Sequence, residues 1–440
     1  MVPKPPAEAA PAKAALSIVG AITAALFAVA YAVSQQRHDN TPRLDPRYCE
    51  GGLRPRPAWA LAQPRRFAPE SPRDGAPPGC DSLPPVRGAY PTTRKLEDIV
   101  ASWPINDTQI RAAVGGLCRF DWSKAEDRQK ALAYRRAEVP FQVFNVSSLD
   151  AAVDRWSSDD YVGTMWHGPA TAEVSTYPRG DFAHGPNHFM FHAGSSAAAP
   201  TTSRSTTLER WLARDARATA EYLSFEVPYA HGGIDRRGGG ARGESVLHKE
   251  LPLFDAAVQS DENFFAPTEE DFADARWPRG IVCKGGDAGV VGAEAHWDAS
   301  RNMIAQVRGT RRFILADPEE ACAMKLLPRG HASHRHSSVD WSQHVDQWPA
   351  ELRSVRAYDV VQRPGDVLYL PQYHMHYIIS LDRNLQCNSV RGRDLRETPK
   401  TRECLQLGPN FECARPATAF EVPVSLLNAE RGLVRACVVD

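Results

Sequence analysis

The sequence lacks an excess of charge of either sign, because 52 Lys and Arg residues balance 53 Asp and Glu residues to a formal net charge of −1. No overall field therefore indicates nucleic acid or an acidic polymer as a partner. The nine cysteines follow no zinc-module spacing. The glycine-rich stretch 235–243 lacks the Lys-Ser/Thr ending and the helical continuation of a phosphate-binding loop. We expect no nucleic-acid partner, zinc module or nucleotide-phosphate site.

A sustained apolar period is also missing from residues 34–92, which are rich in proline, arginine and glycine and predict an extended stem. Residues 14–33 contain no charged side chain and are long enough to cross the hydrocarbon core of a bilayer. They predict a transmembrane signal-anchor behind a cytoplasmic N-terminus of residues 1–13. This favours a type II single-pass protein of the ER or Golgi with its folded part in the lumen. Ala-x-Ala patterns within 28–32 leave secretion after signal cleavage as the alternative.

Other features of the chain fit a lumenal location. Asn106 and Asn145 begin Asn-x-Ser/Thr triplets, the acceptor pattern for N-glycosylation. Nine cysteines are an odd number, so in an oxidising compartment at least one is free or pairs between chains. Cys404 and Cys413 lie close together and predict a disulfide. Cys387 lies within an apolar run and is interpreted as a buried thiol.

The remaining chain predicts one large, mainly β domain with flanking helices. Apolar residues between Leu96 and Trp103 recur at helical spacing, so residues 93–138 are interpreted as a helical lead-in. Residues 139–392 contain short apolar and aromatic runs separated by Gly and Pro, which is typical of strands. Residues 393–440 form a C-terminal extension.

Within the β domain, one carboxylate and two imidazoles suggest a metal site. His296 and Asp298 are two residues apart, so on a strand both side chains point to the same face. Pro364-Gly365 is a turn that starts another apolar strand, and His376 follows that strand. Two histidines and one carboxylate form the facial triad that holds non-haem Fe(II) and leaves three coordination positions open. We therefore predict His296, Asp298 and His376 as metal ligands.

Longer motifs around these residues carry a family resemblance. The segment AHWDASRN at residues 295–302, followed by Gln306 and Gly309, and the segment PGDVLYLP at residues 364–371 ahead of His376 resemble the JmjC and cupin-like (cupin_8) Fe(II)/2-oxoglutarate oxygenases. The resemblance covers roughly residues 94–392 and is most specific from 280 to 390. Within this class the chain is similar to the branch of the asparaginyl hydroxylase that inhibits hypoxia-inducible factor. It is also similar to uncharacterised cupin-like proteins of algae and protists.

The resemblance implies a double-stranded β-helix, or jelly roll, with the metal inside one open end. It implies Fe(II) at His296, Asp298 and His376, with 2-oxoglutarate and O2 as co-substrates and no catalytic side chain beyond the metal ligands. Arg311 stands where the family carries its co-substrate lysine, and an arginine can bind a carboxylate through two parallel hydrogen bonds.

The residues around this predicted site leave several roles open. Arg311 or the neighbouring Arg312 is alternatively a solvated strand residue. Asn302 and Asn388 are predicted to support the co-substrate or the ligands. His374 points the same way as His376 on an extended chain and competes with it as a ligand, although the flanking pattern selects His376. The histidine-rich loop 331–336 is interpreted as a lid or substrate-facing loop, with a second metal site as the alternative.

The predicted function is a membrane-anchored dioxygenase that hydroxylates a side chain of a protein or peptide. The main alternative is a non-catalytic cupin-like module that binds a carbohydrate, a peptide or a structural metal. A zinc cupin acting as an isomerase would need a further carboxylate ligand, for which Glu294 is the candidate. No motif in the sequence identifies the substrate or the oligomeric state.

Overall fold

The computed structural model divides the chain into two compact units, residues 1–56 and 57–440. It describes residues 80, 84, 90, 92–114, 116–166, 170–175, 187–188, 201–216, 220–228, 246–254, 264–265, 280–327, 335–390 and 399–405, all of which belong to the second unit. The predicted N-terminus 1–13 and anchor 14–33, and nearly all of the stem 34–92, lie outside the described residues, so these three assignments stay predictions. Among the residues that are described, no helix is both long and apolar enough to cross a membrane.

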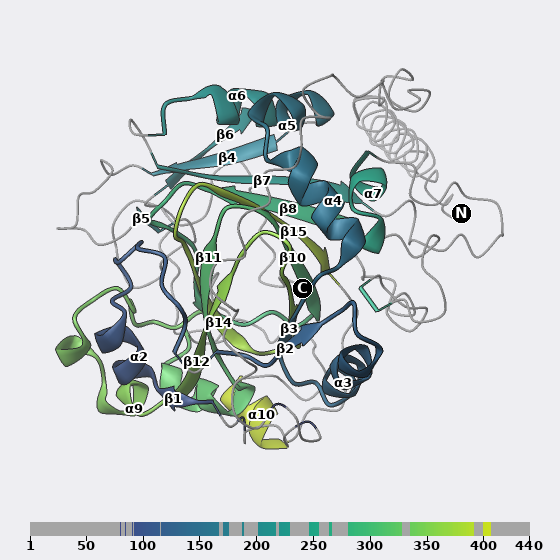
Figure 1. Ribbon diagram of the computed structural model, residues 1–440. Helices are drawn as coiled ribbons and strands as arrows, with labels where there is room; N and C mark the ends of the chain where they lie inside the picture. Colours follow the sequence, from purple (N-terminus) through teal and green to yellow (C-terminus); the bar gives the residue numbers. More distant parts are fainter. Residues whose placement is uncertain are drawn as a thin grey trace, which may run out of the picture. The chain divides into compact units, whose positions relative to one another are not determined.

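Eight antiparallel strands form the centre of the second unit (Figure 1). They are β8 (Gly280–Gly286), β9 (Val290–His296), β10 (Asn302–Arg308), β11 (Arg311–Ala316), β12 (Arg356–Gln362), β13 (Val367–Leu370), β14 (Met375–Ser380) and β15 (Asn384–Val390). The order β13-β10-β15-β8 lies in one sheet and β12-β11-β14-β9 in the other. Strands that are consecutive in the chain lie in alternate sheets, except β11 and β12, which lie in the same sheet. This is the predicted double-stranded β-helix.

Further strands widen both sheets. The sheet with β8 continues through β7 (Glu221–Pro228), β4 (Ala170–Ser175) and β6 (Thr201–Thr206), and at its other edge through β3 (Phe141–Phe144) and β2 (Arg119–Asp121). The second sheet gains β1 (Arg94–Lys95) beside β12 and β5 (Asn187–His188) beside β9. Within the predicted β domain 139–392, β3 is the first strand along the chain.

Helices flank the sheets (Figure 1). They are α2 (Leu96–Ser102), α3 (Ala125–Arg136), α4 (Ser147–Trp156), α5 (Asp159–Met165), α6 (Leu208–Ala213), α7 (Val246–Glu250), α9 (Ala350–Arg353) and α10 (Pro399–Cys404), with 3-10 helices η5 (Pro252–Phe254), η6 (Pro318–Met324) and η7 (Val345–Gln347). The lead-in predicted as helical contains α2 and α3, and also the short strands β1 and β2. In α2 the residues Leu96, Ile99 and Val100 are buried, as their helical spacing predicts.

Strand β11 is buried on both faces, which explains the continuous apolar run that follows its two arginines. In β11, Phe313 and Leu315 belong to one core cluster, which also contains residues of α3, α4 and β13. Ile314 and Ala316 alternate with them and belong to a second cluster, which also contains residues of α2 and α9. Because neighbouring side chains of a strand point to opposite faces, one short strand contributes to two cores.

Three disulfides correct the cysteine assignments. Cys387 is not a free thiol but is bonded to Cys283, which lies directly opposite it in the pairing of β15 with β8. Cys404 is bonded to Cys322 in η6 rather than to Cys413. A third bond joins Cys80 to Cys118. Short sequence separation favoured the pair 404–413, but the docking of α10 onto η6 places Cys404 beside Cys322.

Candidate metal centre

Two histidines face each other across neighbouring strands. His296 is the last residue of β9, and its Cα partner in the adjacent strand β14 is His376. Both are buried, with exposed fractions of 5% and 3%. Their ring centroids are 4.1 Å apart. Strand pairing therefore brings together two residues that are far apart in the sequence.

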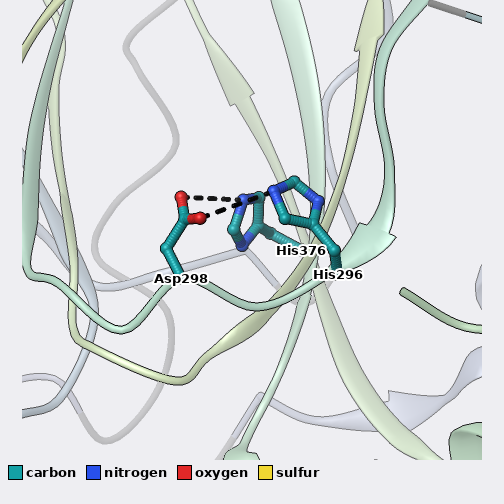
Figure 2. Close-up of side chains that lie close together, drawn as sticks. All are labelled: His296, Asp298 and His376. Atoms are coloured by element: carbon teal, nitrogen blue, oxygen red, sulfur yellow. Dashed lines mark ion pairs between the residues drawn. The ribbon is translucent and has the colours of Figure 1, made fainter. Parts of the chain in front are cut away.

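Asp298 completes the cluster from the segment that follows β9. Its carboxylate lies to one side of the two rings and faces both, with Oδ1 3.8 Å from Nε2 of His296 and Oδ2 3.8 Å from Nε2 of His376 (Figure 2). One ligand atom from each of the three residues lies within 4.8 Å of the others. The Asp298 side chain is 31% exposed, so the cluster opens on this side.

Backbone carbonyls fix the orientation of both imidazoles. Nδ1 of His296 lies 2.7 Å from the carbonyl oxygen of Glu294, and Nδ1 of His376 lies 2.9 Å from that of His374. A carbonyl can only accept, so Nδ1 carries the proton in each ring and Nε2 keeps its lone pair. This is the arrangement of metal-binding histidines, whose second nitrogen donates to a carbonyl or carboxylate.

The protonation states also suit a cation. Burial lowers the pKa of His296 well below its usual value, and the neighbouring His376 lowers it further. Burial likewise lowers the pKa of His376, against an opposing effect of Asp298. For Asp298 burial raises the pKa, but the interaction with His296 and the guanidinium charge of Arg335 outweigh burial and hold it below the usual aspartate value. Two neutral imidazoles and one carboxylate therefore face one point.

His374 does not join this cluster. Its Nε2 lies 3.1 Å from Oδ1 of Asp317, and its side chain is buried. The adjacent Tyr373 has a positive φ of 64° and donates its backbone N–H to the carbonyl oxygen of Asp298 at 2.7 Å. A positive φ is uncommon for a residue other than glycine. The hydrogen bond directly joins the segment that contains Asp298 to the segment that precedes His376. The flanking sequence pattern thus selected the histidine that faces Asp298.

A segment that sequence reasoning placed in a lid lies against the metal cluster. Arg335 donates from Nη1 to Oδ1 of Asp298 at 2.6 Å. The ring of His336 stacks on that of His296, with centroids 4.8 Å apart, and the two residues form a β-bridge. The segment thus holds ligand residues in place; His331 and His334 lie outside the described residues.

Arg311 points into the space between the two sheets and is fully buried, as is Arg312. The interpretation of either as a solvated residue is therefore wrong. Arg312 forms a two-pronged ion pair with Asp359 at 2.9 and 3.1 Å, whereas Arg311 donates from Nε to Oδ1 of Asn384. Within the described part of the chain, Nη1 and Nη2 of Arg311 are buried without a hydrogen-bond acceptor.

Small and polar residues shape the space around Arg311. The guanidinium carbon lies 5.6 Å from the ring centroid of Tyr222. A Cβ atom on Gly286 would lie 2.5 Å from Oγ of Ser380 and 3.6 Å from Nη2 of Arg311. The Ser380 hydroxyl is also buried without a partner among the described residues. These features give Arg311 and Ser380 buried polar groups that a carboxylate could pair with.

The other predicted residues occupy different positions. Asn302 begins β10 and is buried, with Oδ1 lacking a donor among the described residues. Asn388 accepts a hydrogen bond from Nε2 of Gln386 at 2.9 Å and has no contact with Arg311 among those given by the structure. Asn384, on the same face of β15, contacts Arg311 instead. Asn384, Gln386 and Asn388 alternate along β15 and so share one face, but they lie at different depths in the space between the two sheets. Glu294 lies outside the convergent group found among the described residues.

The comparisons with known proteins agree with this architecture. The sequence profile of the Cupin-like domain family matches residues 133–389. The chain is similar to tRNA wybutosine-synthesizing protein 5 of Danio rerio, with 28% identity over 93 residues, 21% of this chain and 27% of that protein. It is also similar to Jumonji C domain-containing protein 5 of Drosophila melanogaster, with 31% identity over 96 residues, 22% of this chain and 23% of that protein. The chain thus spans about a quarter of the length of these two relatives.

Proposed function

Since this chain belongs to the Cupin-like domain family, we propose that it is an Fe(II)- and 2-oxoglutarate-dependent oxygenase that hydroxylates a side chain of a protein or peptide. The observation that carries the proposal is the convergence of His296, Asp298 and His376 with both Nε2 lone pairs facing the carboxylate. Similarity to a Jumonji C protein supports the same class. The asparaginyl-hydroxylase branch indicated by the sequence motifs remains a prediction.

The residues present fit both the metal and the co-substrate. His296, Asp298 and His376 would hold Fe(II) on one side and leave its other side open. Arg311 would bind the distal carboxylate of 2-oxoglutarate, because its two buried amino groups have no other acceptor among the described residues. When bound, iron with 2-oxoglutarate and O2 supplies the oxidation of a C–H bond. The protein contributes ligand orientation through Glu294, His374 and Arg335, and a largely buried site.

The alternative of a non-catalytic binding module depended on two departures from the family pattern. His374 is paired with Asp317 and leaves the metal site to His376. Arg311 is fully buried, which is compatible with a cation that binds a co-substrate. Neither departure therefore favours a binding module over an enzyme.

We further propose that the β domain works in an oxidising lumen or outside the cell. Three disulfides join described cysteines, and disulfides of this kind persist in such compartments. Asn106 and Asn145 are both exposed, which suits glycosylation. A membrane anchor at residues 14–33 would hold the domain there. A protein or peptide substrate is compatible with the balanced net charge of −1.

The test is formation of succinate from 2-oxoglutarate by purified protein reconstituted with Fe(II) under air. We expect turnover in the wild type and its loss in His296→Ala and Asp298→Ala. His344→Ala serves as the matched control, because this imidazole is 75% exposed and lies outside the metal cluster. Iron-loaded wild-type protein that forms no succinate would instead support the binding module.

A further inference from the structure

Lys284 is a cation on strand β8 whose side chain points into the space between the two sheets. Cys283 points to the outer core, where it is bonded to Cys387. Neighbouring side chains of a strand point to opposite faces, so Lys284 points to the inner face. Gly286, two residues on, confirms this direction, because a Cβ there would approach Ser380 and Arg311.

The pairing of strands places Lys284 nearer the open end than Arg311. Lys284 lies opposite Gln386 on β15, whereas Gly286 lies opposite Asn384, the residue that contacts Arg311. Lys284 is therefore one pleat repeat, about 6–7 Å, from the level of Arg311. Lys284 is half-buried whereas Arg311 is fully buried. Lys284 and Arg311 thus lie at different depths of the space between the two sheets.

The charges around the candidate cluster agree with this position. The ammonium group of Lys284 is among the groups that lower the pKa of Asp298 and of His376. Arg335 is another cation with this effect, and it is bound to Asp298. Among the described residues, the ammonium group of Lys284 has no hydrogen bond and no ion pair.

An anion next to a half-buried ammonium group offsets the cost of removing that group from water. The distal carboxylate of a co-substrate is already accounted for by Arg311. We propose that Lys284 is a substrate-anchoring residue and that the substrate presents an acidic group, such as an Asp or Glu side chain, next to the reacting C–H bond. This inference rests on the proposed oxygenase function and adds the chemical class of its protein or peptide substrate.

The experiment uses two pools of synthetic peptides of equal length. One contains Asp and Glu at half of its variable positions, and the matched pool contains Asn and Gln there. We expect only the acidic pool to stimulate succinate formation by the wild type and to gain an oxygen atom by mass spectrometry. Lys284→Gln is expected to weaken this stimulation about tenfold or more, the effect of losing a charged hydrogen-bond partner. Lys284→Glu is expected to prefer a third, Lys-rich pool.

Matched controls separate this effect from folding and from co-substrate binding. Lys124→Gln removes a lysine whose side chain is 60% exposed, and it should behave as the wild type. The affinity of the Mn(II)-loaded protein for 2-oxoglutarate should change less than about twofold in Lys284→Gln, since about tenfold accompanies a lost charged contact. A larger loss of affinity for 2-oxoglutarate in Lys284→Gln, together with an unchanged preference for the acidic pool, would assign Lys284 to the co-substrate and overturn the proposal.

The remaining outcomes distinguish the two proposals. Equal stimulation of the wild type by both pools, with normal succinate formation, overturns the role of Lys284 alone. Absence of succinate with every pool contradicts the oxygenase function. In that case binding of fluorescent peptides to the Mn(II)-loaded protein decides about Lys284. Preference for the acidic pool that is lost in Lys284→Gln supports the anchor, and equal binding of both pools overturns it.

Discussion

His374 and Asp317 form a buried pair, with Nε2 of the histidine 3.1 Å from Oδ1 of the aspartate. The same histidine accepts the Nδ1–H of His376 at its backbone carbonyl, 2.9 Å away. The side chain of one histidine thus anchors the backbone that orients its neighbour. This relationship explains why two histidines in the segment HMH have different roles.

We predict that His374→Phe leaves metal binding intact but destabilises the fold, because Asp317 loses its imidazole partner while Tyr358 still donates to it. The expected loss is about 1–3 kcal/mol, the usual cost of an unsatisfied buried polar group. His376→Phe is the comparison variant and should abolish binding of Mn(II). Urea denaturation and isothermal titration calorimetry measure the two effects. If His374→Phe abolished metal binding and His376→Phe did not, the ligand assignment would be reversed.

Arg311 should control the affinity for 2-oxoglutarate and not for the metal. Arg311→Met is expected to weaken binding of 2-oxoglutarate to the Mn(II)-loaded protein by about 10- to 100-fold, since charged hydrogen bonds contribute about 1.5–3 kcal/mol. Arg311→Lys should bind 2-oxoglutarate more tightly than Arg311→Met, because lysine restores the positive charge but not the two parallel N–H donors of the guanidinium. Arg136→Met, an exposed residue of α3, is the control. Unchanged affinity in Arg311→Met would remove Arg311 from the co-substrate site.

Arg335 should orient the Asp298 carboxylate. Arg335→Met is expected to lower the affinity for Mn(II) by about 10- to 100-fold, the range seen when a residue supporting a metal ligand is removed. Arg335→Lys keeps a hydrogen-bond donor within reach of Asp298 and should lower the affinity for Mn(II) less than Arg335→Met does. The measurement is calorimetric titration of metal in the absence of 2-oxoglutarate. An increase in metal affinity would instead show that Arg335 competes with the metal for Asp298.

The stability of the metal-free protein should fall as the pH decreases through about 6.5, the usual histidine pKa. His296 and His376 have lowered pKa values in the folded state, so the unfolded state binds protons first. Stability contributed by the neutral rings is therefore complete above the unfolded pKa and declines below it, by at most about 1.4 kcal/mol per pH unit for each histidine.

The check is urea denaturation with EDTA at pH 7.5 and 5.5. The double variant His296→Asn/His376→Asn should lose less stability over this interval than the wild type. An equal loss in both proteins would show that other groups cause the pH dependence.

The disulfide between Cys283 and Cys387 should stabilise the central sheet. Replacing both residues with alanine is expected to lower the free energy of unfolding by about 2–5 kcal/mol, the usual effect of removing a native disulfide.

Non-reducing peptide mapping should also recover Cys404 linked to Cys322. Recovery of a Cys404–Cys413 peptide would contradict the docking of α10.

Local sequence determined several features because their causes are local. The two-residue spacing of His296 and Asp298 predicted that they lie together, although Asp298 follows β9 and is not part of it. Gly and Pro between the apolar runs indicated the strands. The helical spacing from Leu96 identified α2. In each case the relevant interaction is between residues close in the chain, so a periodic pattern records it.

Long-range pairing determined what the sequence left open. The register of β14 against β9 set His376 opposite His296, and the contact with Asp317 directed His374 elsewhere. The pairing of β8 with β15 placed Cys283 opposite Cys387, and Lys284 points into the space between the two sheets. A side chain's face follows from local alternation, but its depth and neighbours depend on strand register between distant segments. Only the tertiary structure fixes that register, and with it the cations that surround the metal site.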